Sequence, residues 1–246
     1  PDIRVLAASG PLYAGVETTK ILKNVMTTGL DFTGFGCNGI LPNEIGNFET
    51  LSKLDMRWNL LYGPLNEAIG QLKTIQEINF SGNMLDGSLT TAMFKQLDGM
   101  RILNLSNNYL SGTVCDFFKW TPRLEVLDLS NNMFHGALPA SFATLNKLKV
   151  LKLQCNGFSG PIPTIFDKFP ELTVVNLSNN RFGGNFSDCK MYSCTQLERV
   201  MISDNLLTGH LKAEIGNLTQ LKILYLHRNS LRGVLPPEIC QCLQLR

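Results

Sequence analysis

The sequence of 246 residues lacks the features that mark several common classes of protein. No apolar run approaches the ~20 residues of a membrane-spanning helix. Charged residues make up only 17%, the net charge is +2, and Lys and Arg are scattered, so there is no basic footprint for nucleic acid. Only three histidines occur, which leaves few groups for acid–base catalysis. The hydrophobic share of 44% nevertheless excludes disorder and predicts an ordered core.

A short phrase recurs along the chain. Residues 103–112 read LNLSNNYLSG, and residues 127–136 read LDLSNNMFHG. The second Asn of the phrase returns every 24 or 25 residues, at Asn59, Asn83, Asn108, Asn132, Asn156, Asn180, Asn205 and Asn229. A Gly follows four residues after each Asn, and this Gly column continues upstream through Gly39 and Gly15, which gives ten units. A fixed period of this length predicts a solenoid, one domain whose units contact only their neighbours.

Each unit contains the pattern of a short strand. In Leu127, Asp128, Leu129 and Ser130 the apolar and polar residues alternate with period two, which predicts a strand with one buried face. Successive strands would stack in parallel about 4.8 Å apart, with the leucines in the core. One unit cannot bury its leucines alone, so the strict period follows from the need for neighbours.

The recurring Asn and Gly are predicted to be structural. The Asn lies where the chain leaves the strand and its backbone groups lose their ladder partners. An amide side chain is both donor and acceptor, so a column of Asn can satisfy those groups in every unit. The Gly four residues later suits a turn where φ is positive or a side chain would clash.

These residues resemble the plant-type leucine-rich repeat, with consensus LxxLxLxxNxLxGxIPxxIgxLxxL. Residues 148–166 read LKVLKLQCNGFSGPIPTIF, and residues 221–239 read LKILYLHRNSLRGVLPPEI. The resemblance implies an α/β-type solenoid, a horseshoe or superhelix of about ten 24-residue repeats. It implies a parallel sheet on the concave face, with short 3-10 or irregular segments and short extra strands on the outer side. Such modules form the ectodomains of receptor-like kinases and receptor-like proteins, and secreted inhibitors of cell-wall polygalacturonases.

Departures from the consensus gather at the N-terminal end. Pro11 and Phe35 replace the Asn in the first two units, so the units at about 3–26 and 27–50 are expected to be irregular. Paired-cysteine end caps, usual in the secreted family, are absent, and Leu245 begins an eleventh unit. We therefore expect residues 1–246 to form a single solenoid cut from a longer protein.

The predicted inner face comprises three positions per unit: the residue between the two strand leucines and the two residues after the second leucine. Most units hold Asn or Asp, then Ser, then Asn there. Candidate ligand-binding residues are those that depart from this default: Arg57, Trp58, Lys152, Gln154, Tyr225, His227 and Arg228.

Some of these candidates have a structural alternative. Trp58 lies between Gly34 and Gly82 in its column, so it could anchor an interface or lie flat over the glycines. Arg228 could pair with Asp204 on the neighbouring strand, and Lys152 could pair with Asp128 in the same way.

Catalysis and metal binding are not expected. Cys155 and His227 share the inner face but lie three strands apart, roughly 14 Å, whereas a nucleophile and its base need about 3 Å. Asp31 and Asp55 are neighbours in one column and should repel each other unless a cation lies there, for which Arg57 is the internal candidate. The sequence therefore predicts no enzyme, no cofactor and no metal.

Seven cysteines occur, an odd number, so at least one is unpaired within this sequence. Cys37, Cys194 and Cys242 fill positions that are apolar in other units, which predicts buried thiols. Cys189 and Cys194 could instead close a small disulfide loop. The cysteines thus leave the redox compartment open.

Five Asn residues begin an N-x-S/T glycosylation sequon: Asn79, Asn104, Asn176, Asn185 and Asn217. Three of them arise from the strand consensus itself. Asn217 lies at an outer, polar site and is the preferred candidate for a glycan. Asn79 and Asn104 are one strand apart, so both cannot easily be occupied.

Three hypotheses about function remain. The first is recognition of a peptide or protein ligand, with or without a co-receptor, by the extracellular part of a receptor-like kinase or receptor-like protein in signalling or defence. Its membrane anchor would lie outside these residues. The second is a secreted inhibitor of cell-wall enzymes. The third is an intracellular scaffold, in which case the sequons are accidents of the consensus.

Overall fold

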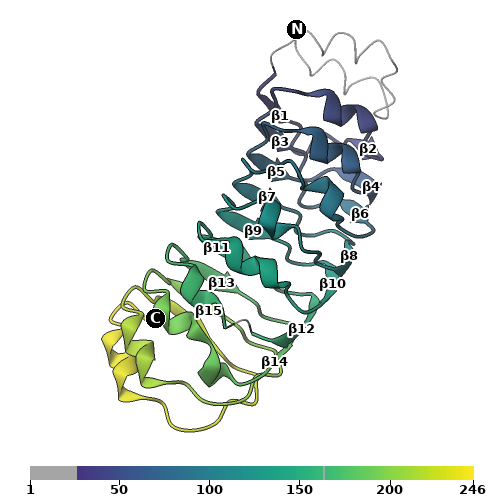
Figure 1. Ribbon diagram of the computed structural model, residues 1–246. Coiled ribbons are helices and arrows are strands. Elements are labelled where there is room, and N and C mark those ends of the chain that lie inside the picture. Colours follow the sequence, from purple (N-terminus) through teal and green to yellow (C-terminus); the bar gives the residue numbers. More distant parts are fainter. Residues whose placement is uncertain (1–26, 163) are drawn as a thin grey trace.

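The computed structural model describes residues 27–162 and 164–246, which form a solenoid whose units follow one another along its length (Figure 1). The first predicted unit, with Pro11 and Gly15, lies outside the described residues. Nine parallel strands make the main sheet in chain order: β1 (Gly29–Asp31), β3 (Lys53–Asp55), β5 (Glu77–Asn79), β7 (Ile102–Asn104), β9 (Val126–Asp128), β11 (Val150–Lys152), β13 (Val174–Asn176), β15 (Arg199–Met201) and β16 (Ile223–Tyr225).

The strands pair so that equivalent positions of neighbouring units lie side by side. Leu54 in β3 is opposite Ile78 in β5, which in turn is opposite Leu103 in β7. The middle residue is buried in the main strands except β16, where Leu224 is half-buried, and the first and third residues of most strands point to the opposite surface. The repeat period therefore sets the register directly, and it creates one core side and one solvent side.

Two smaller parallel sheets run along the other edge of the solenoid (Figure 1). The first contains β2 (Asn38–Gly39), β4 (Leu60–Pro64) and β6 (Met84–Asp86). The second contains β8 (Ser111–Thr113), β10 (Met133–Gly136), β12 (Gly157–Pro161) and β14 (Arg181–Gly183). These are the short extra strands that the plant-type repeat implies.

Each described unit also contains one or two short 3-10 helices, which precede the next main strand where one follows. They are η1 (Asn43–Asn47), η2 (Glu67–Gln71), η3 (Thr91–Met93), η4 (Phe118–Trp120), η5 (Ala140–Thr144), η6 (Phe166–Lys168), η7 (Phe186–Asp188), η8 (Lys190–Ser193), η9 (Ala213–Asn217) and η10 (Pro237–Gln241). With the parallel main sheet, they confirm the predicted leucine-rich repeat solenoid.

A continuous hydrophobic core fills the space between the sheets and the helices. Leucines of the main strands supply one wall, and phenylalanines fill the opposite side. Phe142 packs edge-on against Phe118 and Phe169, with ring centroids 5.2 and 5.3 Å away. Because Phe142 contacts rings of both neighbouring units, the core joins these units into one body.

The Asn column forms a hydrogen-bonded ladder. In Asn83, for example, Nδ2 donates to the carbonyls of Phe80 (2.9 Å) and Met56 (3.0 Å), and Oδ1 accepts from the backbone N–H of Leu61 (3.1 Å). The last two partners belong to the preceding unit. The same arrangement recurs at Asn59, Asn83, Asn108, Asn132, Asn156, Asn180, Asn205 and Asn229. Each Asn thus satisfies backbone groups that lack sheet partners.

Residues 27–50 contain β1 and η1 and pair in register with the next unit, although Phe35 stands in the Asn column. The turn differs there, because the Phe35 N–H donates to the Phe32 carbonyl (3.2 Å) and Phe35 is 42% exposed.

The recurring Gly is required by its backbone conformation and by the closeness of the preceding unit. At Gly136 φ is 81°, and an added Cβ would lie 2.9 Å from Cγ2 of Thr113 in the unit before.

Candidate ligand-binding face

The solvent side of the main sheet, hereafter the inner face, carries most of the non-default residues. Each unit presents four positions on it: the first and third residues of the strand and the residues two and three places after the strand. The last of these has a positive φ between 53° and 57° wherever it is not Gly. Asn, Asp and Gly tolerate this left-handed conformation best, so the default Asn in that column follows from the backbone.

At the N-terminal end, Arg57 is held by its neighbours. Its NH2 group lies 3.2 Å from Oδ2 of Asp55, and its Nε donates to Oγ1 of Thr33 (3.2 Å) on the preceding unit. Asp55 is only 2% exposed, so the ion pair fixes the guanidinium from below. Hydrogen bonds from the Thr33 hydroxyl and N–H lower the pKa of Asp31. Arg57 therefore sits where the two neighbouring aspartates require a cation.

Both interpretations of Trp58 apply, because its ring covers a glycine and still exposes part of its surface. Its six-membered ring lies over Gly82, since a Cβ there would be 2.5 Å from Cε3 and 2.9 Å from Cζ3. The residue is nevertheless 62% exposed, so its remaining surface is open to solvent. Its backbone has φ 57°, a strained conformation for a bulky residue. Strain of this kind gathers at functional sites, and it makes Trp58 a candidate binding residue.

In the middle of the sheet the predicted candidates are tied to the framework. Lys152 Nζ lies 3.5 Å from Oδ2 of Asp128, the expected cross-strand pair. Gln154 is half-buried, and its Oε1 has no hydrogen-bond partner among the described residues. Cys155 is exposed with φ 56°. Lys152 is thus partly neutralised, and the amide oxygen of Gln154 is buried and not presented to solvent.

At the C-terminal end, Asp204 lies close to two of the candidates, Arg228 and His227. Arg228 NH1 lies 3.1 Å from Oδ1 of Asp204, and His227 Nε2 lies 3.9 Å from Oδ2. The Tyr225 and His227 rings lie with centroids 6.0 Å apart. Tyr225 is 48% exposed. The structure therefore brings Tyr225, His227 and Arg228 into one cluster, far along the sheet from Arg57 and Trp58.

A fourth column of the inner face was not among the predicted candidates. It is the first residue of each strand, and in four consecutive units it is a half-buried aliphatic side chain. We call these four the aliphatic stripe: Ile102, Val126, Val150 and Val174. Period-two alternation, continued one step toward the N-terminus of each strand, would have found them.

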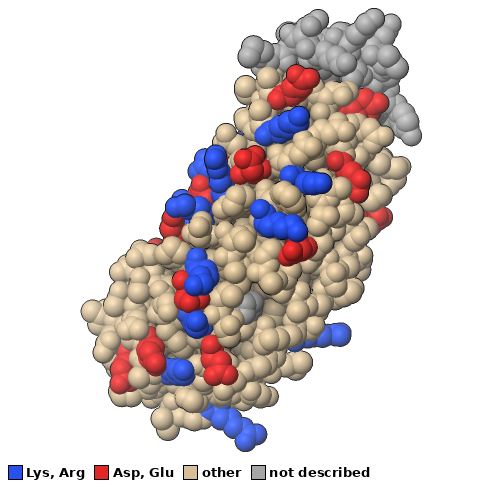
Figure 2. Space-filling view, viewed as in Figure 1, with Lys and Arg blue, Asp and Glu red and all other residues tan. Residues whose placement is uncertain are grey.

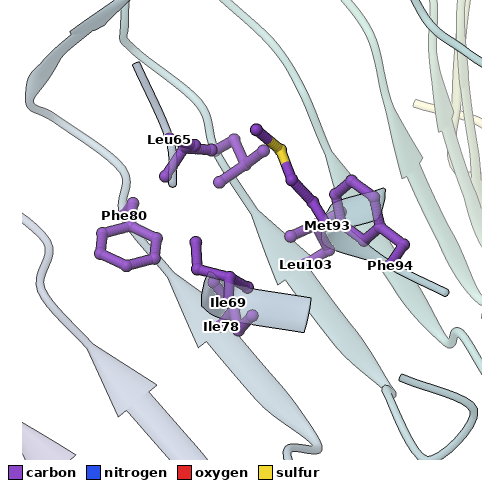
Figure 3. Close-up of a pocket in the computed structure, with 8 residues that line it drawn as sticks. Leu65, Ile69, Ile78, Phe80, Met93, Phe94 and Leu103 are labelled. Atoms are coloured by element: carbon purple, nitrogen blue, oxygen red, sulfur yellow. The ribbon is translucent and has the colours of Figure 1, made fainter. Parts of the chain in front are cut away.

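The described residues contain no group of three or more His, Cys, Asp or Glu that could hold a metal, and no helix long and apolar enough to cross a membrane. A core cavity lined by Leu65, Ile69, Phe80 and Met93 measures about 10 Å³ (Figure 3), which is room for about one water. This cavity thus lies in the core and not on the inner face. Positive and negative side chains are interleaved over the surface in Figure 2.

One contact has the geometry of a nucleophile and base. Ser187 Oγ lies 3.1 Å from Nδ1 of His210. The buried hydroxyl also accepts from the backbone N–H of His210 (3.0 Å) and donates to its carbonyl (3.0 Å). Ser187 thus bridges neighbouring units and is oriented by the backbone.

The cysteine prediction is corrected in part. Cys189 and Cys194 are both free and buried, so the disulfide considered between them is not formed. Cys194 Sγ instead donates to the carbonyl of Phe166 (3.0 Å), and burial raises the pKa of both thiols to about 12. Cys242 is a buried thiol as well, whereas Cys37 is only half-buried.

The five sequons differ in how their Asn side chains are used. Oδ1 of Asn79, Asn104 and Asn176 accepts the backbone N–H of the sequon Ser two residues later. Asn185 caps η7 by accepting from the N–H of Ser187. Asn217, the last residue of η9, is exposed. Among the five, Asn217 thus has the fewest local constraints.

Comparisons with known proteins agree with this architecture. A family model described as leucine-rich repeat matches residues 116–182, and a second leucine-rich repeat model matches residues 99–120 and 220–242. No curated protein matches the sequence. The family models thus cover the middle and the C-terminal end of the solenoid.

Solved structures extend the match. The leucine-rich repeat ectodomain of the Arabidopsis thaliana membrane receptor kinase GASSHO1/SCHENGEN3, in complex with CASPARIAN STRIP INTEGRITY FACTOR 2, matches with TM-score 0.74 and 26% identity over 85% of this chain and 28% of its own. The TDR receptor matches with TM-score 0.81 and 29% identity over 85% of this chain and 36% of its own.

The Arabidopsis receptor kinase HAESA, with the peptide hormone IDA and the co-receptor SERK1, matches with TM-score 0.82 over 91% of this chain and 37% of its own. At 24% identity this likeness speaks for the fold alone. The present chain spans 28% to 37% of the length of these three structures. Together with the family models, they support a plant-type leucine-rich repeat protein that resembles the ectodomains of plant receptor kinases.

Proposed function

We propose that this solenoid recognises a peptide or protein ligand along its inner face, as part of the extracellular region of a plant cell-surface receptor. The observation that carries the proposal is the distribution of non-default residues. Arg57 and Trp58 lie at one end of the inner face, and Tyr225 and His227 lie at the other. Seven strand spacings separate them, roughly 34 Å. An extended peptide of about ten residues spans that distance.

The comparisons support this class of ligand. The GASSHO1/SCHENGEN3 ectodomain, which is 26% identical to this chain, is in complex with CASPARIAN STRIP INTEGRITY FACTOR 2, and the PEPR1–AtPEP1 structure matches at 27% identity. The leucine-rich repeat ectodomain fold is typical of recognition proteins that are not enzymes. An open face without a deep pocket suits an extended or protein ligand better than a small molecule.

Each candidate residue would make a different contact with the ligand. The open surface of the Trp58 indole would bury an apolar or proline side chain of the ligand, because large aromatic residues supply much of the energy at interfaces. The guanidinium of Arg57, fixed by Asp55, would donate to a carbonyl or carboxylate. Tyr225 and His227 would contact the far end of the ligand.

The test uses a phage-display library of random linear dodecapeptides, selected on the folded chain. Enriched peptides are then titrated by fluorescence anisotropy against the wild type and the triple variant Trp58→Ala, Tyr225→Ala, His227→Ala. We expect the triple variant to bind at least about tenfold more weakly. Met133→Ser is the control, because Met133 is 54% exposed on β10, away from the main sheet, and it should bind as the wild type does. Absence of enriched peptides, or equal binding by the triple variant, would contradict the proposal.

An extracellular location also leads us to propose a glycan on Asn217. Its exposed position at the end of η9 leaves the inner face uncovered. Glycopeptide mass spectrometry of the chain secreted from plant cells should find a glycan on Asn217. An unmodified Asn217 in the secreted protein would refute this proposal.

A further inference from the structure

We infer that the aliphatic stripe and Arg199 together form the central subsite of the inner face, and that it takes an extended peptide segment with alternating aliphatic side chains followed by a carboxylate. The inference rests on the proposed function and names the chemistry of the ligand. It involves residues other than the candidates at the two ends of the face.

The fold does not require aliphatic residues in the stripe. The same column holds Gly29, Lys53, Glu77 and Arg199 in four other units and Ile223 in the last unit, and all of these form regular strands. Four consecutive units nevertheless place a β-branched aliphatic side chain there, in direct register: Ile102 is opposite Val126, which is opposite Val150, which is opposite Val174. A continuous apolar row on a solvent-facing sheet is a surface that gains free energy when a partner covers it.

The charges around the stripe are largely satisfied internally. Along the edge of the sheet, Glu125 bonds Arg101 Nε (2.6 Å) and Lys149 Nζ (2.9 Å). On the other side of the stripe, Lys152 pairs with Asp128 (3.5 Å). Each of these charged groups thus has an opposite partner within the protein, so a bound peptide would not have to supply one.

Arg199 is different. It occupies the same column directly beyond Val174, in register with it and with Ile223 on the far side. The other inner-face cations of the described chain each have a carboxylate: Lys53 with Glu77, Arg57 with Asp55, Lys152 with Asp128, and Arg228 with Asp204. Arg199 is exposed and forms no ion pair or side-chain hydrogen bond with another described residue. It is therefore available for a carboxylate of the ligand.

The opposite end of the stripe has the complementary sign. Glu77 directly precedes Ile102 in the column and is held by Lys53 at 3.8 Å. A ligand lying along the stripe would thus meet a free cation at one end and a compensated carboxylate at the other. This asymmetry favours a ligand whose acidic group lies at the Arg199 end.

The dimensions define the ligand further. Four strands about 4.8 Å apart give a row roughly 14 Å long. An extended chain rises about 3.3 Å per residue, so about five residues cover the row, with alternate side chains turned toward it. We therefore expect aliphatic residues at positions i, i+2 and i+4 of the ligand, and a carboxylate within about two residues beyond them. That carboxylate can be an acidic side chain or the C-terminus of the peptide.

The test compares peptides enriched on the wild-type chain with their binding to two variants. Val126→Thr combined with Val150→Thr keeps the shape and strand preference of the side chains but removes apolar surface, and Arg199→Glu reverses the free charge. We expect the enriched peptides to contain alternating aliphatic residues. They should bind the double variant about fivefold more weakly, and Arg199→Glu about tenfold more weakly. Each peptide is made with a free and with an amidated C-terminus, so that the source of the carboxylate is identified.

Exchanging the charges of Arg199 and of the peptide distinguishes a direct contact between them from a structural defect of the variant. In one peptide variant Lys replaces the acidic residue, and in another an amidated Lys replaces the terminal carboxylate. Either change should restore binding to Arg199→Glu and should not improve binding to the wild type. Thermal midpoints of all variants should match the wild type, and Met133→Ser should bind normally. Peptides that need Trp58 and Tyr225 but are indifferent to the stripe and Arg199 would overturn this inference and leave the proposed function intact. A selection that enriches no peptide would overturn both.

Discussion

The two sides of the main sheet are built by the same strands, but their residues follow different rules. On the core side, Leu103, Leu127 and Leu151 repeat the same side chain at less than 2% exposure. On the inner face, the adjoining residues Asn104, Asp128 and Lys152 differ in charge from strand to strand. The core side is repeated because each unit must bury its neighbour, and the inner face is free to vary. Substitutions on the first side should therefore change stability, and those on the second should change binding.

The largest effect should come from the core. Phe142→Ala removes a fully buried ring that packs against Phe118 and Phe169, and it should lower the free energy of unfolding by about 4 kcal/mol. Tyr225→Ala removes a ring of similar size from the inner face, where it is 48% exposed, and should lower it by less than about 1 kcal/mol. Denaturant unfolding measures both. Equal losses would mean that the inner face also carries the stability of the fold.

The Asn ladder gives a contrast between adjacent residues. Asn108→Ala leaves the carbonyl of Phe80 and the N–H of Leu85 without the partners they now have at 3.0 Å, and should lower the free energy of unfolding by about 3 kcal/mol. The preceding Asn107 is exposed with φ 57°, so Asn107→Gly should change it by less than about 0.5 kcal/mol. Thermal denaturation of the two variants tests this order. A smaller loss for Asn108→Ala than for Asn107→Gly would refute the ladder as a source of stability.

The sequence predicted the core side of the main sheet well and the inner face only in part. The period of the Asn and Leu columns was enough for the solenoid, its parallel sheet and its register, because only stacked units can bury those leucines. The column of Ile102 and Val126 was missed because the inner face was counted from the residue between the two leucines. The strand begins two residues before that point.

Two features of the inner face could not be read from residue types. The column that holds Asn107 and Trp58 looked like a variable binding position, but its left-handed backbone already selects Asn, Asp and Gly. The Trp58 ring had glycines on both sides, and only the structure shows that it lies over Gly82. Torsion angles and rotamers depend on packing around the residue, which a repeat pattern does not specify.

The ion pairs of Glu125 with Arg101 and Lys149, at the edge of the main sheet, can be tested by the pH dependence of stability. Hydrogen bonds from Arg101 and Lys149 lower the pKa of Glu125 from 4.5 to about 2. A carboxylate with a depressed folded-state pKa stabilises the fold above its unfolded pKa, and that contribution is lost as the pH falls toward about 2. At pH 6, Glu125→Gln should therefore be less stable than the wild type by about 1 kcal/mol, and the gap should close by about pH 2.

Denaturant unfolding between pH 6 and pH 2 measures this gap. Added salt at 1 M should narrow it at pH 6, because the three side chains are partly exposed and their attraction is screened. A gap of constant size across the whole pH range would show that Glu125 acts through packing and not through its charge.

The smallest effect should have the opposite sign. Cys155 is exposed on the inner face with φ 56°, and its neighbours in the column, Asn131 and Asn179, adopt the same conformation with a residue better suited to it. Cys155→Asn should therefore raise the free energy of unfolding by about 0.5 to 1 kcal/mol, because the left-handed backbone is less strained with Asn. Thermal denaturation measures the gain, and Ser178→Asn, in another column, should give none. A gain for Cys155→Asn together with unchanged peptide binding would place Cys155 with the framework, whereas a gain accompanied by weaker binding would mean that this unit keeps a strained residue for its ligand.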